Sequence, residues 1–214
     1  MARALLIRLA RALLTMTVAA PLLCHAESNL QSAAASPLTA TAHVDFQITI
    51  PEYLFLRVGT GTGSALGGWG VNGNIDLIAW APGPATLGNG VALAGTGGDL
   101  TGGVETAVVV ANHGNVTLSA TTLGSLNDGA GDTISYSSIS TTASKLTTNQ
   151  VLPAPVLADG ATTTVVVRGK GKSKSVQRDA QWAYTYANAT VPAAGTYGGV
   201  NTNNGRVTYT ASTP

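Results

Sequence analysis

The sequence is poor in cysteine, in aromatic residues and in charge. Its 214 residues include one cysteine, 5% aromatic residues and 10% charged residues. A single cysteine excludes an internal disulfide, so the fold must rely on a hydrophobic core, which a chain of this length is able to bury. The hydrophobic fraction is 44%, which is ordinary for a globular domain and excludes the composition of a disordered chain.

Catalytic and cofactor motifs are also missing. No serine stands in a G-x-S-x-G elbow, and no H-E-x-x-H zinc motif occurs. His43 shares a strand face with Asp45, as two exposed polar positions of an amphipathic strand would, and His113 stands alone. Residues 68–73 fit the dinucleotide pattern G-x-G-x-x-G, which needs a helix after it, but a strand is expected there. We therefore predict no enzyme and no cofactor, with a secreted hydrolase as the weakest alternative.

The first 26 residues have the three parts of a secretory signal peptide. The positive n-region contains Arg3, Arg8 and Arg11. The apolar stretch at residues 12–23 is shorter than the roughly 20 residues of a membrane span. Small residues, Cys24 and Ala26, then stand at the −3 and −1 positions of a cleavage site. Lipid attachment at Cys24 is the alternative, but Leu23 occupies a position where a small residue is expected. We predict export to the periplasm, cell surface or medium, with no transmembrane segment.

The charge of the mature chain argues against nucleic acid as a partner. Cleavage after Ala26 removes three of the 11 basic residues and none of the 10 acidic ones, which leaves a net charge of −2. Nucleic-acid-binding domains are usually strongly basic.

Short strands with glycine-rich connections follow a Ser/Ala-rich lead-in at residues 27–40. Apolar and polar residues alternate strictly over residues 43–50, and a second strand is expected at residues 53–58, after Pro51. Further strands are expected at residues 75–80, 105–111, 115–121, 132–140, 162–168, 181–187, 195–197 and 206–211. No helical apolar period follows residue 26. About nine short strands predict a single all-β domain at residues 41–214, an immunoglobulin-like β-sandwich.

The apolar positions of residues 42–50 are candidate partner-binding residues. These side chains are Val44, Phe46, Ile48 and Ile50. An extended segment with this spacing is able to add to the sheet of a neighbouring subunit, because its main chain forms hydrogen bonds while alternate side chains fill pockets. Pairing within its own domain is the alternative, and both interpretations stay open.

Two charged segments suggest further sites. Asp128 and Asp132 flank a tight glycine turn and are candidate ligands for Ca²⁺. The candidate site is weak because Ca²⁺ prefers six to eight oxygen ligands, which is more than two carboxylates supply. The other segment is basic and contains Arg168, Lys170, Lys172 and Lys174. If the preceding strand continues, these cations share one face. They form either a solvated hairpin tip or a patch for anionic lipid, polysaccharide or a partner subunit.

The three tryptophans leave a carbohydrate-binding module as an alternative function. Trp69, Trp80 and Trp182 are able to stack on sugar rings. Trp80 and Trp182 fall in expected strands, however, where packing in the core is the usual role of this side chain.

The C-terminal region resembles that of secreted pilin-like sandwiches. Residues 191–199, VPAAGTYGG, followed by the alternating residues 206–210, are similar to the P-x-A-G-x-Y ending of chaperone–usher fimbrial subunits and spore-coat-U-type proteins. The chain departs from them in the insertion at residues 200–205 and in lacking a cysteine pair. The resemblance implies a β-sandwich that assembles at the cell surface, by contact with itself or other subunits, without cofactor or active site.

Overall fold

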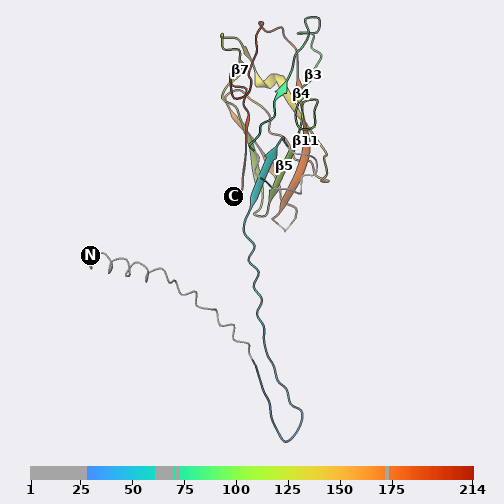
Figure 1. Ribbon diagram of the computed structural model, residues 1–214, viewed down its shortest axis with the longest axis vertical. Helices are drawn as coiled ribbons and strands as arrows, with labels where there is room; N and C mark the ends of the chain where they lie inside the picture. Colours follow the sequence, from blue (N-terminus) through green and yellow to red (C-terminus); the bar gives the residue numbers. More distant parts are fainter. Residues whose placement is uncertain (1–27, 61–69, 71–72, 172–173) are drawn as a thin grey trace, which may run out of the picture. The chain divides into compact units, whose positions relative to one another are not determined.

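The computed structural model describes residues 28–60, 70, 73–171 and 174–214 (Figure 1). It separates the chain into two units, Met1–Ile50 and Pro51–Pro214. The compact β-rich unit therefore begins at Pro51 rather than at residue 41. The predicted signal peptide, Trp69 and Lys172 lie outside the described residues. Within the described residues, no helix is long and apolar enough to cross a membrane.

Residues 28–50 contain no helix and no strand. The strand expected at residues 43–50 is therefore not formed, although its alternating pattern is clear. Its apolar side chains are exposed: Val44 by 73%, Phe46 by 90%, Ile48 by 86% and Ile50 by 74%. An extended segment becomes a strand only when a neighbour accepts its backbone hydrogen bonds.

The unit Pro51–Pro214 is almost entirely β, as the sequence predicts. Its elements are β1 Leu54–Val58, β2 Ile78–Ala79, β3 Leu93–Ala94, β4 Thr96–Gly97, β5 Val104–Ala111, β6 Val116–Thr121, β7 Leu126–Asn127, β8 Thr133–Ile134, a 3₁₀ turn Tyr136–Ser138, β9 Ile139–Ser144, β10 Thr162–Val167, β11 Val176–Tyr186 and β12 Thr208–Ser212. The described strands outnumber the nine expected because the two-residue strands β3, β4 and β7 fall outside the ranges expected from the sequence.

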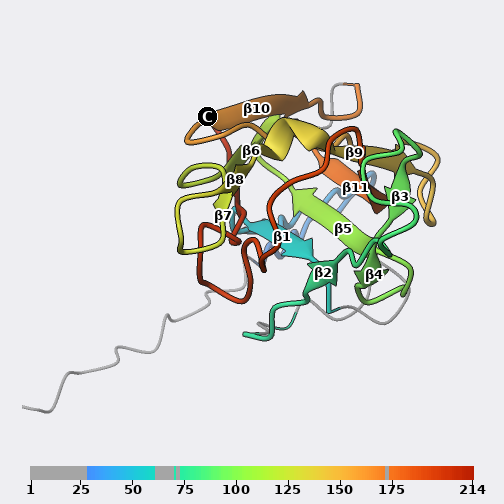
Figure 2. The same ribbon diagram turned by 90° about the horizontal axis from the view of Figure 1, so that it is seen from above.

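Two antiparallel sheets face each other across the core (Figure 2). The larger sheet has the order β1-β5-β11-β3, and β9 also pairs with β11. The smaller has the order β10-β6-β12. Core side chains come from both sheets, and they include Val109, Leu118, Val167, Val176 and Trp182. The result is a sandwich-like fold.

Of the two strands expected near the C-terminus, only the second is formed, and it pairs with a strand distant in the sequence. β12 lies against β6, with Thr208 opposite Thr121 and Ser212 opposite Thr117. Residues 195–197 are not a strand. Gly198 and Gly199 have φ values of 76° and 139°, in the left-handed region that bends the chain away from an extended path.

The large sheet is covered on both faces. Seven of the eight residues of β5 are buried. On the face away from the main core, Val108 and Val110 pack with Phe55. Asp179 is fully buried on that same face and accepts hydrogen bonds from Thr147 and Thr148.

Candidate functional site

An apolar groove runs along the border of the two sheets, between β1 and β12. β1 pairs with β5 and β12 pairs with β6, and each strand has no second partner within the part of the chain that the structure describes. The two strands lie close together. The groove has a volume of about 1240 Å³ and is lined by Leu56 and Val58 of β1, by Thr208 and Tyr209 of β12, and by residues within 74–82 and 191–207. It therefore combines an apolar surface with two strands that each end their sheet within the described residues.

Aliphatic and aromatic side chains both line the groove. The aliphatic ones include Leu56 and Val58 of β1. Five of the chain's six tyrosines line the groove, together with Trp80; these tyrosines are Tyr136, Tyr184, Tyr186, Tyr197 and Tyr209. Leu56, Val58 and Tyr209 pack against the core but are only half-buried. A side chain from outside the unit would complete their packing.

Tyr136, Tyr184 and Tyr209 form hydrogen bonds through their hydroxyls within the unit. Those of Tyr184 and Tyr209 share a hydrogen bond of 3.0 Å, and the Tyr136 hydroxyl donates to the carbonyl of Asn204 at 2.7 Å. Burial raises the pKa of Tyr136 and the pKa of Tyr209 to about 12. These rings therefore stay neutral at physiological pH. The Trp182 ring packs against Tyr209 with a centroid separation of 5.3 Å.

One acidic pair lies at the wall of the groove. Glu105 is 4% exposed, and burial raises its pKa to about 8, with further increases from the neighbouring Asp76 and Asp99. A protonated Glu105 shares a hydrogen bond with Asp76, and it accepts one from the backbone N–H of Asp99 at 3.3 Å. The groove therefore carries one negative charge fewer at neutral pH than its sequence suggests.

Gly59 makes this carboxyl pair sterically feasible. It has a φ of +73°, and a Cβ at this position would lie 2.5 Å from oxygen atoms of both Asp76 and Glu105. Its backbone N–H donates to the carbonyl of Thr106 at 2.8 Å. Only glycine fits both the backbone conformation and the available space.

The basic segment is a loop rather than a continued strand. β10 ends at Val167, and Lys174 adopts a positive φ of 49°. Arg168, Lys170 and Lys174 are exposed. A shared strand face was expected only if the preceding strand continued, and β10 ends before Arg168. Lys172 lies outside the described residues.

The aspartate turn is closed by its own side chain. The Oδ1 atom of Asp128 accepts the backbone N–H groups of Ala130, Gly131 and Asp132 at 2.8, 3.0 and 3.1 Å. These bonds, led by that from Ala130, lower the pKa of Asp128. Among the residues that the structure describes, no group of three or more His, Cys, Asp or Glu side chains is placed to hold a metal ion.

His113, Trp80 and Trp182 have structural contacts. His113 Nδ1 lies 2.7 Å from Glu52 Oε1. Trp182 is fully buried, and its indole N–H donates to the carbonyl of Leu152 at 2.9 Å. Trp80 is half-buried, and its N–H donates to the carbonyl of Leu93 at 3.1 Å.

Sequence reasoning identified the exposed apolar segment but not the groove. The groove depends on which strand edges remain unpaired, and no local pattern carries that information. The nearest signal is the concentration of tyrosines toward the C-terminus, at positions 184, 186, 197 and 209.

Comparison with known proteins adds no relative. No protein-family model, curated protein or solved structure matches this chain.

Proposed function

We propose that this protein is an exported structural subunit of a fimbria-like surface polymer. In this assembly, residues 42–50 of one copy lie in the groove between β1 and β12 of the next. The observation that carries the proposal is the complementarity of two exposed features. One is a row of four uncovered apolar side chains, and the other is an apolar groove bordered by unpaired strand edges.

The dimensions of the segment suit the groove. The nine residues 42–50 extend roughly 30 Å in a strand, at about 3.3 Å per residue. The bordering strands β1 and β12 have five residues each, and the groove continues past them to loop residues such as Leu126 and Val191. The segment is therefore longer than either bordering strand.

The chemistry of the segment also suits the groove. Burial of each large apolar side chain contributes about 1.5–3 kcal/mol, opposed by the entropy lost on ordering the segment. Val44, Phe46, Ile48 and Ile50 would point toward the core, while Asp45, Gln47 and Thr49 would face outward. The main chain would form hydrogen bonds with the free edges.

The resemblance of the C-terminal ending to fimbrial subunits points to the same function. It lies in residues 191–210, which include groove-lining residues such as Tyr197 and Tyr209. Under this proposal the protein needs no catalytic group, and its partner is a second copy or another subunit of the same surface structure.

The test compares ladders of the exported mature protein on SDS gels without boiling. We expect wild type to form an SDS-resistant ladder. The double variant Phe46→Asp/Ile48→Asp is expected to lose it, because two charges would enter an apolar groove. The matched control Gln47→Asp, on the outward-facing side of the segment, is expected to keep the ladder.

Deletion separates the two interpretations of residues 42–50. If the segment is a donor strand, removing residues 27–50 leaves a folded monomer with an unchanged far-UV circular dichroism spectrum. If the segment belongs to its own domain, the same deletion unfolds the protein. A wild-type mature protein that is strictly monomeric by light scattering at high concentration would contradict the proposal.

A further inference from the structure

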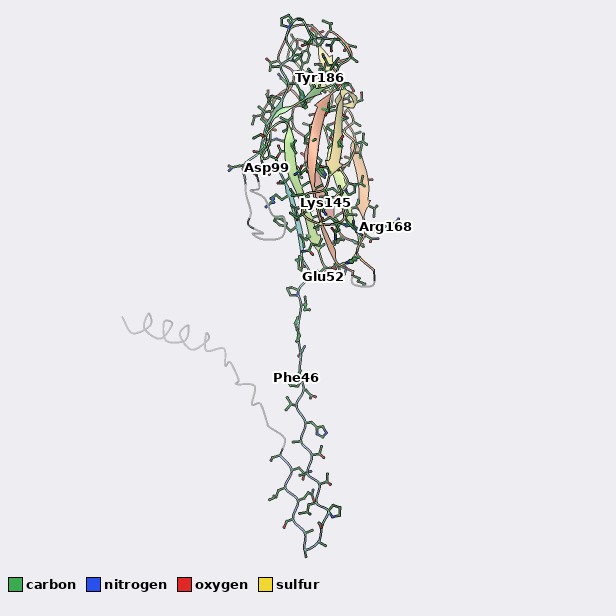
Figure 3. The ribbon with its side chains drawn as sticks, turned by 90° about the vertical axis from the view of Figure 1, so that its right-hand side faces the viewer. Phe46, Glu52, Asp99, Lys145, Arg168 and Tyr186 are labelled. Atoms are coloured by element: carbon green, nitrogen blue, oxygen red, sulfur yellow. The ribbon has the colours of Figure 1, made fainter. Side chains whose placement is uncertain are left out.

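The charges of the unit Pro51–Pro214 are separated along its strands. β6 and β10 are antiparallel, with Thr121 opposite Thr162 at one end and Val116 opposite Val167 at the other. The basic loop follows Val167, whereas the turn at residues 128–132 follows β6 and β7 at the other end. We call these the basic end and the acidic end. In Figure 3, Arg168 lies toward the end marked by Glu52, and Tyr186 toward the opposite one.

The basic end gathers four described cations, Arg168, Lys170, Lys174 and Arg178. The loop is held against the β5–β6 turn, because the N–H of Gly114 donates to the carbonyl of Lys174 at 2.7 Å. The Arg178 guanidinium donates to the carbonyl of Arg168 at 2.9 Å, which leaves its charge at the same end. Two carboxylates lie near these cations. Glu52 pairs with His113, and Asp179 is buried and bound by threonines.

The acidic end gathers Asp128, Asp132 and Asp159. The Asp159 carboxylate accepts the N–H of Tyr136 at 2.7 Å. Burial raises the pKa of Asp159, but hydrogen bonds from Ser135, Tyr136 and Ser125 outweigh it, and the net pKa is lowered. One cation, Arg206, precedes β12 at this end. It is half-buried and lines the groove. The end therefore keeps an excess of negative charge at neutral pH.

The chain enters the unit at the basic end. The Asn112 side chain holds the entry, since its Nδ2 donates to the carbonyl of Pro51 at 2.8 Å and its Oδ1 accepts from the N–H of Tyr53 at 3.0 Å. Any neighbour that binds residues 42–50 is therefore brought close to the basic end of the donor. The neighbour is repelled there if its own basic end faces the donor, and it is attracted if its acidic end does.

We infer that the basic end of one copy docks on the acidic end of the next, which gives the polymer a head-to-tail polarity. The inference rests on the proposed function for its geometry. β12 runs from the acidic end, at Thr208, to the basic end, at Ser212. Insertion of residues 42–50 antiparallel to β12 places the donor's basic end against the acceptor's acidic end. Parallel insertion would bring two basic ends together, and like charges in contact oppose association.

The experiment exchanges the charges of the two ends in the full mature protein. Arg168→Glu/Lys170→Glu/Lys174→Asp replaces three of the four described cations of the basic end by carboxylates, so that both ends are acidic, and Asp suits the positive φ of position 174 better than most residues. Asp128→Asn/Asp132→Lys/Asp159→Asn removes the three carboxylates of the acidic end and adds a cation, so that both ends are basic. The amide oxygens introduced at positions 128 and 159 are still able to accept the backbone hydrogen bonds that the carboxylates accept. We expect each variant alone to assemble at least about tenfold more slowly than wild type in 10 mM salt, since electrostatic steering raises association rates by 10–10³. An equimolar mixture of the two is expected to recover the rate, because each reversed end then meets an opposite charge.

A matched control separates end charge from net charge. Thr164→Glu lowers the net charge by one, as Lys170→Gln does, but Thr164 is an exposed residue in the middle of β10, opposite Ser119. We expect Lys170→Gln to slow assembly and Thr164→Glu to leave it near the wild-type rate. Raising the salt from 10 mM to 150 mM shortens the Debye length from about 30 Å to about 8 Å, and this should reduce the difference between wild type and Lys170→Gln.

A second readout keeps the inference testable if strand insertion does not occur. In the Phe46→Asp/Ile48→Asp background, sedimentation velocity at 10 mM salt should still show weak self-association that disappears at 300 mM salt. The end-charge variants should lose this association, and their mixture should restore it. Loss of the ladder with retained salt-sensitive association would remove the proposed strand insertion only. Equal behaviour of wild type, both end variants and their mixture would overturn the inference, whether or not a ladder forms.

Discussion

The two sides of the sandwich differ in how completely they are covered. On the closed side, β5 and β11 are central strands, and Val108, Val109 and Trp182 are almost fully buried. On the open side, β12 alternates between exposed and half-buried residues. Both sides have strand-forming sequences, so the difference arises from neighbours. A strand is buried only where the topology provides a partner on each side.

The same comparison applies to the chain on either side of Pro51. Residues 43–50 and β1 are both apolar and β-prone, but only β1 pairs with a strand, β5. We expect the effect of a substitution on monomer stability to fall from the closed side to the open side and then to residues 43–50.

The largest effect is expected at the centre of the closed side. Trp182→Ala would leave a cavity in the core and an unpaired carbonyl at Leu152. Large-to-small substitutions of this kind lower the free energy of unfolding by about 3–5 kcal/mol. A decrease of less than about 1 kcal/mol would mean that the closed side is not the stabilising core. Urea unfolding of the monomeric Phe46→Asp/Ile48→Asp background would measure the loss.

A smaller, pH-dependent effect is expected at the wall of the groove. The folded-state pKa of Glu105 is raised to about 8 from 4.5, so its contribution to stability is fully present below about pH 4.5 and is lost as the pH rises through 8. Glu105→Gln would abolish this titration while keeping a neutral hydrogen-bonding side chain. We expect the variant to be more stable than wild type at pH 9 and to show a flatter profile between pH 5 and pH 9. Parallel profiles for both proteins would contradict the proposed protonation.

The opposite pH dependence is expected at Asp179 on the closed side. Burial raises the pKa of this carboxylate, but hydrogen bonds from Thr147 and Thr148 outweigh it and lower the pKa below 3.8. Its contribution is therefore present above about pH 4 and is lost as the pH falls through the folded-state pKa. Asp179→Ala should destabilise the protein by about 1–3 kcal/mol at pH 7, since it leaves buried donors without an acceptor. The difference in stability between this variant and wild type should become smaller in acid. Thermal unfolding of both proteins between pH 2 and pH 7 would measure it.

The smallest effect is expected in residues 43–50. Phe46→Ala should change monomer stability by less than about 0.5 kcal/mol, because the side chain is 90% exposed. The same substitution should weaken the SDS-resistant ladder strongly. Matched urea curves for Phe46→Ala and wild type, both recorded on dilute monomer, would give the comparison. A loss of several kcal/mol in the monomer would show that Phe46 packs within its own chain.

Local sequence patterns predicted most strands but few of their partners. Short β-prone runs bounded by turn residues predicted β1, β5, β6 and β10 to within a residue at each end. β11 was expected to begin at residue 181 but begins at Val176. Its first residues are polar on one face, and Asp179 is buried only because Thr147 and Thr148 reach it from a distant loop.

The sequence by itself determined the all-β class and the apolar spacing of residues 43–50. Both follow from the order of apolar and polar side chains along the backbone. Only the tertiary structure decided that this segment remains exposed, that Asp128 caps its own turn, and that β1 and β12 border an apolar groove. These features depend on which strands become neighbours. Side-chain periodicity sets the face that a strand buries, but pairing between residues distant in the sequence sets whether anything covers that face.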